Sequence, residues 1–392
     1  MKVLYLIPGL GVGGGAERSL LDVAPGLAEA GIDLSIAYFH DRSSSAVGAF
    51  RDLGVRVDRI TAPRFAARVR KVHALIAERQ PDVLHTTLFE ADVVGRWAAV
   101  GTSPRVLASL VNTPYEPARY ESDDVSRWRI EAVRRYEGLT LRRLCDHIHA
   151  NSQAVADAAV RSFHVDPARI SVVHRGRDPG RIRSATPEIR AEARASLDLP
   201  PGSPTILSVG RHEPQKGQIH LVRALPAVLD RYPEAILLVA GREGSVSESL
   251  RAEAGASGIA DRIRFLGNRD DIGEVMAAAD VLAFPSLWEG LPGTIIEAMA
   301  VGIPIVASAI GPVCELVDDH TARLVRAADP ADLARGIIEV LDGRAEAAQR
   351  AASARQRFLD DLTVTRAQER MADLYRKVAE LPRERWGARP GR

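Results

Sequence analysis

Cysteine is scarce in this chain of 392 residues. The two present, Cys145 and Cys314, lie far apart in the sequence, so neither a disulfide framework nor a zinc knuckle is indicated. Such a composition suits a reducing compartment, and we expect a cytoplasmic protein. Aromatic residues make up 5% of the sequence and the net charge is +1. Both values argue against a nucleic-acid-binding protein.

Long apolar runs are also absent, and lysine is scarce. No apolar run approaches the ~20 residues that a membrane span requires, and the opening MKVLYLIPGL leads into a glycine-rich loop, so we interpret it as a buried strand rather than a signal peptide. Only four of the 52 basic residues are lysine, which makes a lysine within a motif more informative than an arginine. Residues 1–185 carry 26 basic against 21 acidic side chains, so the excess of positive charge lies in this half.

Short apolar runs alternate with helical patterns along most of the chain. The runs show no in–out alternation, which is typical of parallel strands covered on both faces, and their alternation with helices predicts two doubly wound α/β domains. A segment with five prolines at 175–204 interrupts this order, and we expect a linker near 178–203. The predicted strands are 3–7, 34–39, 55–60, 83–86, 106–110, 147–150, 170–173, 205–209, 236–240, 263–266, 281–284 and 305–307.

The first motif is a glycine loop. Gly9, Gly11 and Gly14 satisfy G-x-G-x-x-G directly after a strand, as in dinucleotide-binding proteins. Asp41 follows the second predicted strand, where such enzymes place an acidic ribose ligand. An NAD(P)-dependent oxidoreductase is therefore one interpretation. A flexible turn into the first helix is the other, because so glycine-rich a loop satisfies many patterns by chance.

Two further motifs lie in the second half. In GRHEPQKG, Arg211 and Lys216 occupy one strand-to-helix turn at the carboxyl edge of a sheet, where two cations suit a diphosphate. In SLWEGLPGTIIEAMA, Glu289 and Glu297 lie on either side of a Gly-Leu-Pro-Gly loop. If a helix begins near Gly293, its first amides point at a phosphate and the carboxylates suit sugar hydroxyls. A solvated loop and an ordinary capped helix are the alternatives.

These strings resemble a known family. SLWEGLPGTIIEAMAVGIPIVAS resembles the E-x7-E segment of the retaining GT-B glycosyltransferases of family 4 (group 1). GRHEPQKG resembles the G-R-x-x-x-x-K-G turn of that family, and GGGAERSLLDVAPGLAEAG resembles the opening of its acceptor domain. The resemblance implies a GT-B fold, with two Rossmann-like doubly wound domains facing a central cleft. The acceptor domain would be 1–185 and the donor domain 186–362, with a helix at about 364–379 crossing back to the first.

The resemblance also implies a reaction. A hexose-like sugar would pass from a nucleoside-diphosphate sugar to a hydroxyl acceptor (a glycan, a lipid-linked acceptor or a small molecule), with retention and without cofactor or metal. Arg211 and Lys216 would neutralise the leaving diphosphate, Glu289 would bind the sugar and Glu297 the ribose diol. A non-catalytic sugar-nucleotide-binding relative is an open alternative. The other implied donor-side residues are Gly14, Gly15, Gly241, Leu266, Gly290, Leu291, Gly293, Thr294 and Ile295.

The chain departs from the family pattern in two places. Where many relatives carry a histidine after the fifth strand, it has Asn112, which can form hydrogen bonds but carries no charge. His85 is a nearby candidate for the acceptor or sugar side, and a structural histidine is the alternative. Arg175 and Arg177 replace part of an Asn-Gly-Val-Asp-like turn and would add charge beside the site.

A basic helix is predicted over 126–144. We expect Ile130, Val133, Leu141 and Leu144 on one face, with Arg127, Arg134, Arg135 and Arg142 clustered on the opposite side. One interpretation is a solvated arginine-rich face. The other is peripheral contact with anionic lipid on the inner membrane surface, which would serve a lipid-linked acceptor in cell-envelope polysaccharide synthesis.

Overall fold

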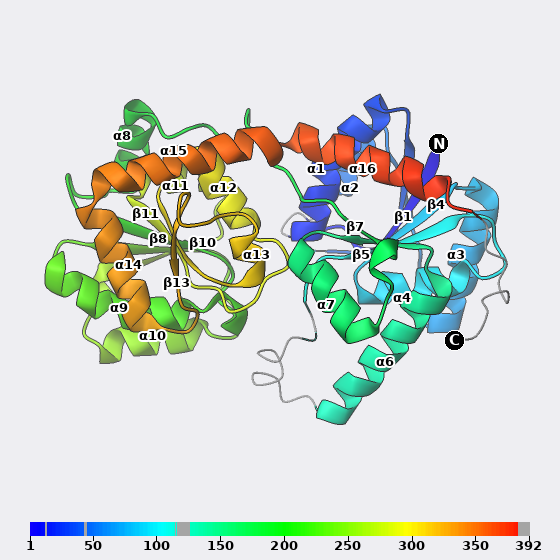
Figure 1. The fold of residues 1–392 in the computed structure, drawn as a ribbon, viewed down its shortest axis with the longest axis horizontal. Helices are drawn as coiled ribbons and strands as arrows, with labels where there is room; N and C mark the ends of the chain where they lie inside the picture. Colours follow the sequence, from blue (N-terminus) through cyan, green and yellow to red (C-terminus); the bar gives the residue numbers. More distant parts are fainter. Residues whose placement is uncertain (12–13, 43–44, 114, 116–125, 383–392) are drawn as a thin grey trace. The chain divides into compact units, whose positions relative to one another are not determined.

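The computed structural model describes residues 1–11, 14–42, 45–113, 115 and 126–382. It divides into two compact units, each built on one sheet (Figure 1). The first unit comprises Met1–Val111, Ser126–His174 and Thr365–Arg392. The second comprises Asn112–Val125 and Arg175–Val364.

The first unit has a parallel sheet of seven strands in the order β3-β2-β1-β4-β5-β6-β7. Alternate residues of β1 enter two different apolar clusters, so both faces of the sheet are covered by helices. The strands are β1 (Lys2–Gly9), β2 (Asp33–His40), β3 (Arg56–Arg59), β4 (Val83–Thr87), β5 (Arg105–Leu110), β6 (His147–Ala150) and β7 (Ile170–Val172). The helices are α1 (Gly15–Glu29), α2 (Val47–Asp52), α3 (Phe65–Arg79), α4 (Phe89–Ala98), α6 (Arg127–Leu144), α7 (Gln153–Phe163) and α16 (Val364–Ala379).

The second unit has a parallel sheet of six strands in the order β10-β9-β8-β11-β12-β13. One face packs on α9, α10 and α14, and the other on α8, α11, α12 and α15 (Figure 1). The strands are β8 (Thr205–Val209), β9 (Ile236–Ala240), β10 (Ile263–Gly267), β11 (Val281–Phe284), β12 (Ile305–Ser308) and β13 (Arg323–Val325). The helices are α8 (Pro187–Ser196), α9 (Gln218–Arg231), α10 (Ser247–Ala256), α11 (Ile272–Ala278), α12 (Gly293–Val301), α13 (Gly311–Cys314), α14 (Pro330–Asp342) and α15 (Arg344–Asp361).

The two predicted parallel sheets are confirmed, and all twelve predicted strands are present, with small differences at their ends. The predicted linker at 178–203 is wrong. It contains α8, which Thr186 caps by accepting a hydrogen bond from the amide of Ile189. The segment also contributes Ile182, Ala193 and Leu199 to the apolar core of the second unit. These prolines therefore begin and end a packed helix instead of separating two domains.

The predicted faces of α6 are correct only in part, since Leu141 and Leu144 are buried and Arg127 and Arg135 are exposed as expected, but other positions differ. Val133 is 41% exposed, whereas Arg134 and Arg142 donate hydrogen bonds to the backbone oxygens of Ser162 and Phe163. Those two oxygens belong to the last turn of α7, and helix carboxyl ends attract cations. The neighbouring helix thus draws two of the predicted surface arginines inward and leaves an apolar face of α6 in solvent.

Candidate functional site

Two loops of the second unit lie side by side because of the way its sheet is wound. The strand order reverses between β8 and β11, which pair directly through Ile206 with Val281 and Leu207 with Leu282. Open α/β sheets bind ligands at the carboxyl ends of the strands beside such a reversal. The GRHEPQKG turn follows β8 and the E-x7-E loop follows β11. The fold therefore brings together the two motifs predicted to bind the donor.

Lys216 and Glu289 join these loops by an ion pair. Nζ of Lys216 donates to Oε1 of Glu289 at 2.6 Å, although 73 residues separate them in sequence. Nε2 of Gln215 donates to Oε2 of the same carboxylate at 3.3 Å. Glu289 is only 7% exposed, so its carboxylate is largely shielded from water and has a defined orientation. Sequence reasoning placed both charged residues in the site but missed their direct contact.

The backbone holds the loops equally closely. The amide of Leu287 donates to the carbonyl oxygen of Gln215 at 2.9 Å. Gly217 has a φ of +60°, and a Cβ at this position would collide with the carbonyl oxygen of Pro285. Only glycine meets both demands without strain. The Lys-Gly pair of the motif therefore has two functions, a charge for the site and a bare backbone for loop contact.

Arg211 differs from Lys216 in its surroundings. Its side chain is exposed, and within the described residues its guanidinium has no hydrogen bond or ion pair. The backbone next to Arg211 is closely packed and carries no side chains. A Cβ on Gly241 would collide with the carbonyl oxygen of Gly210, and the amide of Gly241 donates to the carbonyl oxygen of Gly267 at 2.7 Å. Leu266, beside Gly267, is half-buried. An unpaired cation thus stands near a sheet edge that a ligand can approach closely.

Helix α12 begins at Gly293, as predicted. Its N-cap is Pro292, which has no side-chain acceptor for the first amides. Gly293 and Thr294 are half-buried. The positive end of this helix dipole therefore remains accessible beside the motif loops. The other predicted members of the loop, Gly290, Leu291 and Ile295, are buried.

Glu297 lies one turn inside α12 and is 7% exposed. Nε of Arg177 donates to its Oε1 at 2.8 Å, and Arg177 is itself 4% exposed. A Cβ on Gly293 would collide with Nη2 of Arg177, so this guanidinium lies against the first turn of α12. The sequence predicted Arg177 only as additional charge, and the structure shows it as the ion-pair partner of Glu297.

Of the predicted residues in the first unit, Gly14 is the N-cap of α1 and Gly15 its first residue. His85 lies inside β4 and is 1% exposed. Its Nδ1 is bonded to the hydroxyl of Tyr375 and its Nε2 to that of Ser109, both at 2.6 Å. Burial lowers the pKa of His85 well below its ordinary value, so the ring is neutral. The buried His85 therefore links its own strand β4 to β5 and to α16 through hydrogen bonds.

Asn112 follows β5 and is half-buried, and its Oδ1 accepts a hydrogen bond from the amide of Thr113 at 2.8 Å. Both residues belong to the second unit. The hydroxyl of Thr113 donates to the backbone oxygen of Glu289 at 3.4 Å. The segment after β5 therefore reaches the Lys216–Glu289 pair, and sequence reasoning did not find this connection.

Comparisons with known proteins agree with these motifs. Residues 13–181 match the model described as Glycosyltransferase Family 4, and residues 189–357 match that of Glycosyl transferases group 1. A D-inositol 3-phosphate glycosyltransferase from Actinosynnema mirum is 30% identical over 380 residues, which cover 86% of this chain and 88% of the relative. The chain belongs to the group 1 glycosyltransferases of family 4. The predicted family is confirmed.

Solved structures support the GT-B fold of this glycosyltransferase. HepE from Anabaena, in complex with UDP and glucose, matches with a TM-score of 0.83 and 23% identity, over 96% of this chain and 100% of that chain. Sucrose-phosphate synthase from Thermosynechococcus elongatus matches with a TM-score of 0.80 and 23% identity, over 96% and 99%. The family does not favour the oxidoreductase interpretation of the glycine loop. Asp41, the ribose ligand in that interpretation, pairs with Arg59 at 2.8 Å.

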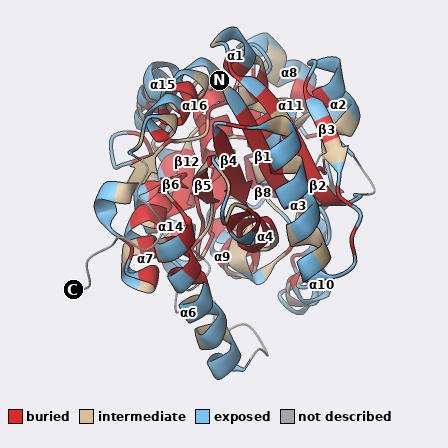
Figure 2. Ribbon diagram, turned by 90° about the vertical axis from the view of Figure 1, so that its right-hand side faces the viewer, coloured by how far each residue is buried: buried red, intermediate tan, exposed pale blue. Residues whose placement is uncertain are grey.

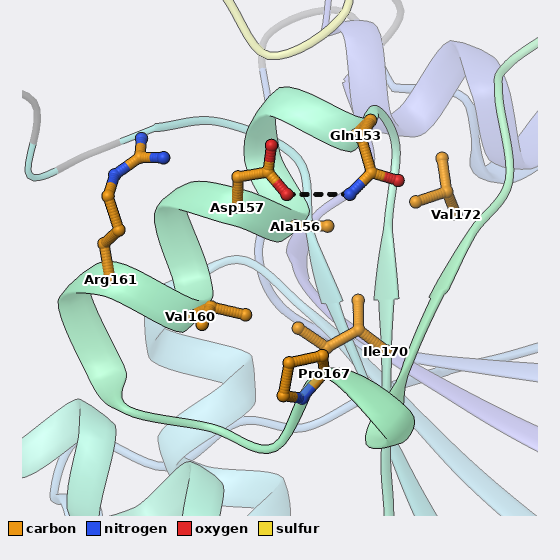
Figure 3. A pocket seen from close by; sticks show the side chains of 8 residues that line it. All are labelled: Gln153, Ala156, Asp157, Val160, Arg161, Pro167, Ile170 and Val172. Atoms are coloured by element: carbon orange, nitrogen blue, oxygen red, sulfur yellow. Dashed lines mark hydrogen bonds between the residues drawn. The ribbon is translucent and has the colours of Figure 1, made fainter.

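In the described ranges, no group of three or more His, Cys, Asp or Glu side chains could hold a metal ion, and no helix is long and apolar enough to cross a membrane. A cavity of about 350 Å³ lies in the first unit between α7 and β7. Figure 3 shows Gln153 donating to Asp157 at its rim, at 2.7 Å. None of the predicted site residues lines it.

Proposed function

We propose that this glycosyltransferase transfers a hexose from a nucleoside-diphosphate sugar to a hydroxyl acceptor, with retention of anomeric configuration and without metal or cofactor. The observation that carries the proposal is the cluster at the β8–β11 reversal. There the Lys216–Glu289 pair lies between loops that also carry the unpaired Arg211 and the amino end of α12. UDP and UDP-glucose, bound by HepE, support a UDP-hexose as donor.

The proposed roles follow from the charges and their placement. Arg211 and Lys216 neutralise the leaving diphosphate, and the first amides of α12 bind its distal phosphate. Glu289 accepts a hydrogen bond from a sugar hydroxyl, and Glu297 accepts hydrogen bonds from the ribose diol. Catalysis then depends on stabilising the charge that develops on the leaving group and on positioning the reactants.

In the proposed reaction the acceptor hydroxyl attacks on the face from which the diphosphate leaves. The bond from the anomeric carbon to the phosphate oxygen breaks, the new glycosidic bond forms, and the departing phosphate takes the proton of the hydroxyl. This scheme uses no enzyme nucleophile. Glu289, held by Lys216, fixes the sugar while the bonds exchange.

Slow hydrolysis of UDP-α-glucose tests this reaction without knowledge of the acceptor, because water then takes the acceptor's place. We expect proton NMR to show α-glucose as the first product, before mutarotation, and a rate unchanged by EDTA. First appearance of β-glucose would contradict retention, and loss of the rate in EDTA would contradict metal independence.

We also propose that α6 brings the first unit to the cytoplasmic face of an anionic membrane, where a lipid-linked acceptor is available. The first residues of α6, 127–129, are all exposed, and this helix is labelled at the lower edge of Figure 2. Its large exposed apolar residues are Trp128 at 67%, Leu139 at 47%, Val133 at 41% and Tyr136 at 39%. Exposed arginines alternate with them at 129, 135 and 143. Aromatic and basic side chains on one helical face suit a lipid headgroup region.

Vesicle flotation tests this contact. At low salt the protein is expected to float with phosphatidylglycerol-containing vesicles and to remain at the bottom with phosphatidylcholine alone. Trp128→Ala combined with Leu139→Ala is expected to abolish flotation. The control is Phe65→Ala, which changes a 49% exposed aromatic residue on α3. No flotation of the unmodified protein at low salt would refute the proposal.

A further inference from the structure

Arg177 connects the donor site to a segment where the chain leaves the second unit. Its side chain pairs with Glu297 in α12. Its backbone pairs with Thr363, directly before the chain passes from the second unit to the first at Val364. The side chain and the backbone of Arg177 therefore contact two segments, at Glu297 and at Thr363, that are more than 60 residues apart in sequence.

The backbone of Arg177 is held on both sides. Its amide donates to the carbonyl oxygen of Leu362 at 3.0 Å, and its carbonyl oxygen accepts from the amide of Val364 at 2.8 Å. The preceding residue is Gly176, where a Cβ would collide with the carbonyl oxygen of Thr363. The close approach of the two segments thus requires glycine at 176, and it fixes the point from which the Arg177 side chain extends.

The side chain is equally constrained. Nη1 of Arg177 donates to the carbonyl oxygen of Gly176 at 3.1 Å, while Nε donates to Oε1 of Glu297 at 2.8 Å. The bond to Gly176 fixes the planar guanidinium, so that its Nε–H points at Oε1 of Glu297 in a set direction, which the point charge of a lysine would not do. Because Arg177 and Glu297 are both nearly buried, water cannot replace this contact.

We propose that Arg177 is a positioning residue of the donor site, which orients the Glu297 carboxylate toward the ribose diol and so sets the preference for ribonucleotides over 2′-deoxyribonucleotides. The inference rests on the proposed function, because it takes Glu297 as the ribose ligand. Hydrogen bonds to two adjacent hydroxyls require a fixed carboxylate plane. Arg177 supplies that plane without touching the substrate.

Calorimetric titration with UDP and with 2′-deoxy-UDP measures this preference as a ratio of two dissociation constants. We expect the unmodified protein to bind UDP about tenfold or more tightly than the deoxynucleotide, as the loss of a hydrogen bond to a charged group predicts. Arg177→Met is expected to bring the ratio close to one, mainly by weakening UDP, and Arg177→Lys to give an intermediate ratio. A purely structural role would weaken both nucleotides alike and leave the ratio unchanged.

Arg181→Met is the matched control, since this side chain is 75% exposed and pairs only loosely with Asp178, at 3.6 Å. Gly176→Ala provides a second route, because it retains the guanidinium but displaces the backbone that carries it. We expect a reduced ratio there too, and the unmodified ratio in Arg181→Met. The variant therefore tests the inference even where Arg177→Met does not fold.

The outcomes separate the two proposals. If the unmodified protein binds neither nucleotide, the proposed UDP donor fails and this inference fails with it. If it binds UDP and 2′-deoxy-UDP equally well, Glu297 does not bind the ribose 2′-hydroxyl and the inference is overturned. If it prefers UDP while Arg177→Met or Gly176→Ala retains the full preference, only the role of Arg177 is overturned.

Discussion

Replacing Lys216 by methionine is expected to reduce turnover by about 10²–10³-fold, the usual cost of removing one preorganised group that stabilises developing charge. Lys216 pairs with Glu289 at 2.6 Å, and in the proposed reaction charge develops on the leaving diphosphate beside them as the bond to the sugar breaks. Methionine retains much of the side-chain length but no charge. Initial rates of UDP release from UDP-glucose provide the measurement, and Lys216→Arg is expected to recover part of the loss.

Arg223→Met is the control for this prediction. Arg223 is in α9, the helix that follows the motif turn, but its side chain is 50% exposed and pairs with Glu253 at 2.9 Å on the surface. Its replacement is expected to leave turnover unchanged. Since Lys216→Met also leaves Glu289 without its cation, each variant needs a melting curve to show that it is folded. A folded Lys216→Met protein within a few-fold of normal turnover would contradict the role of this lysine.

Replacing Arg177 by methionine is expected to lower the free energy of unfolding by about 3–5 kcal/mol, because it removes an ion-pair partner of the buried Glu297 carboxylate. Adding Glu297→Gln in the same chain is expected to recover most of that loss, since a neutral amide costs far less to bury than a carboxylate that has lost this partner. Urea denaturation of the single and double variants measures both effects.

Arg181→Met, at an exposed position, is again the control variant. We expect it to change the free energy of unfolding by no more than about 0.5 kcal/mol. If the double variant proved as unstable as Arg177→Met alone, the loss would come from packing around the arginine stem and not from the lost ion pair. That result would contradict a charge-based account of the Arg177–Glu297 pair.

The motif loops could be predicted because their residues are unusual for the places they occupy. The loops that follow the clearly apolar strands β8 and β11 contain one of the four lysines and glycines that no other residue could replace. The start of α12 at Gly293 could be predicted from the Gly-Leu-Pro-Gly loop. The three-residue strand β13 escaped prediction because Arg323 and the charged residues around it leave almost no apolar run. Helix α8 escaped for a different reason. Its start signal, Thr186 followed by Pro187, lies within a proline-rich segment whose composition favours a linker, and this composition outweighed the signal.

Contacts between distant segments could not be predicted from one sequence. Glu297 and Arg177 are 120 residues apart, and the sequence around either residue does not indicate that it contacts the other. The faces of α6 were partly mispredicted for the same reason, since the carbonyl oxygens that bind Arg134 and Arg142 belong to α7. His85 has the sequence context of a site histidine, yet its partner Tyr375 comes from α16 near the other end of the chain.

The central claim, that the second unit binds a nucleoside-diphosphate sugar, is tested most directly by the melting temperature of the protein with UDP, GDP, ADP, CDP, TDP and NADH in turn. A ligand present at a hundred times its dissociation constant stabilises the folded state by about 2.7 kcal/mol, which is readily visible as a shift. We predict stabilisation by UDP and none by NADH. Stabilisation by NADH with no response to any nucleoside diphosphate would contradict the account.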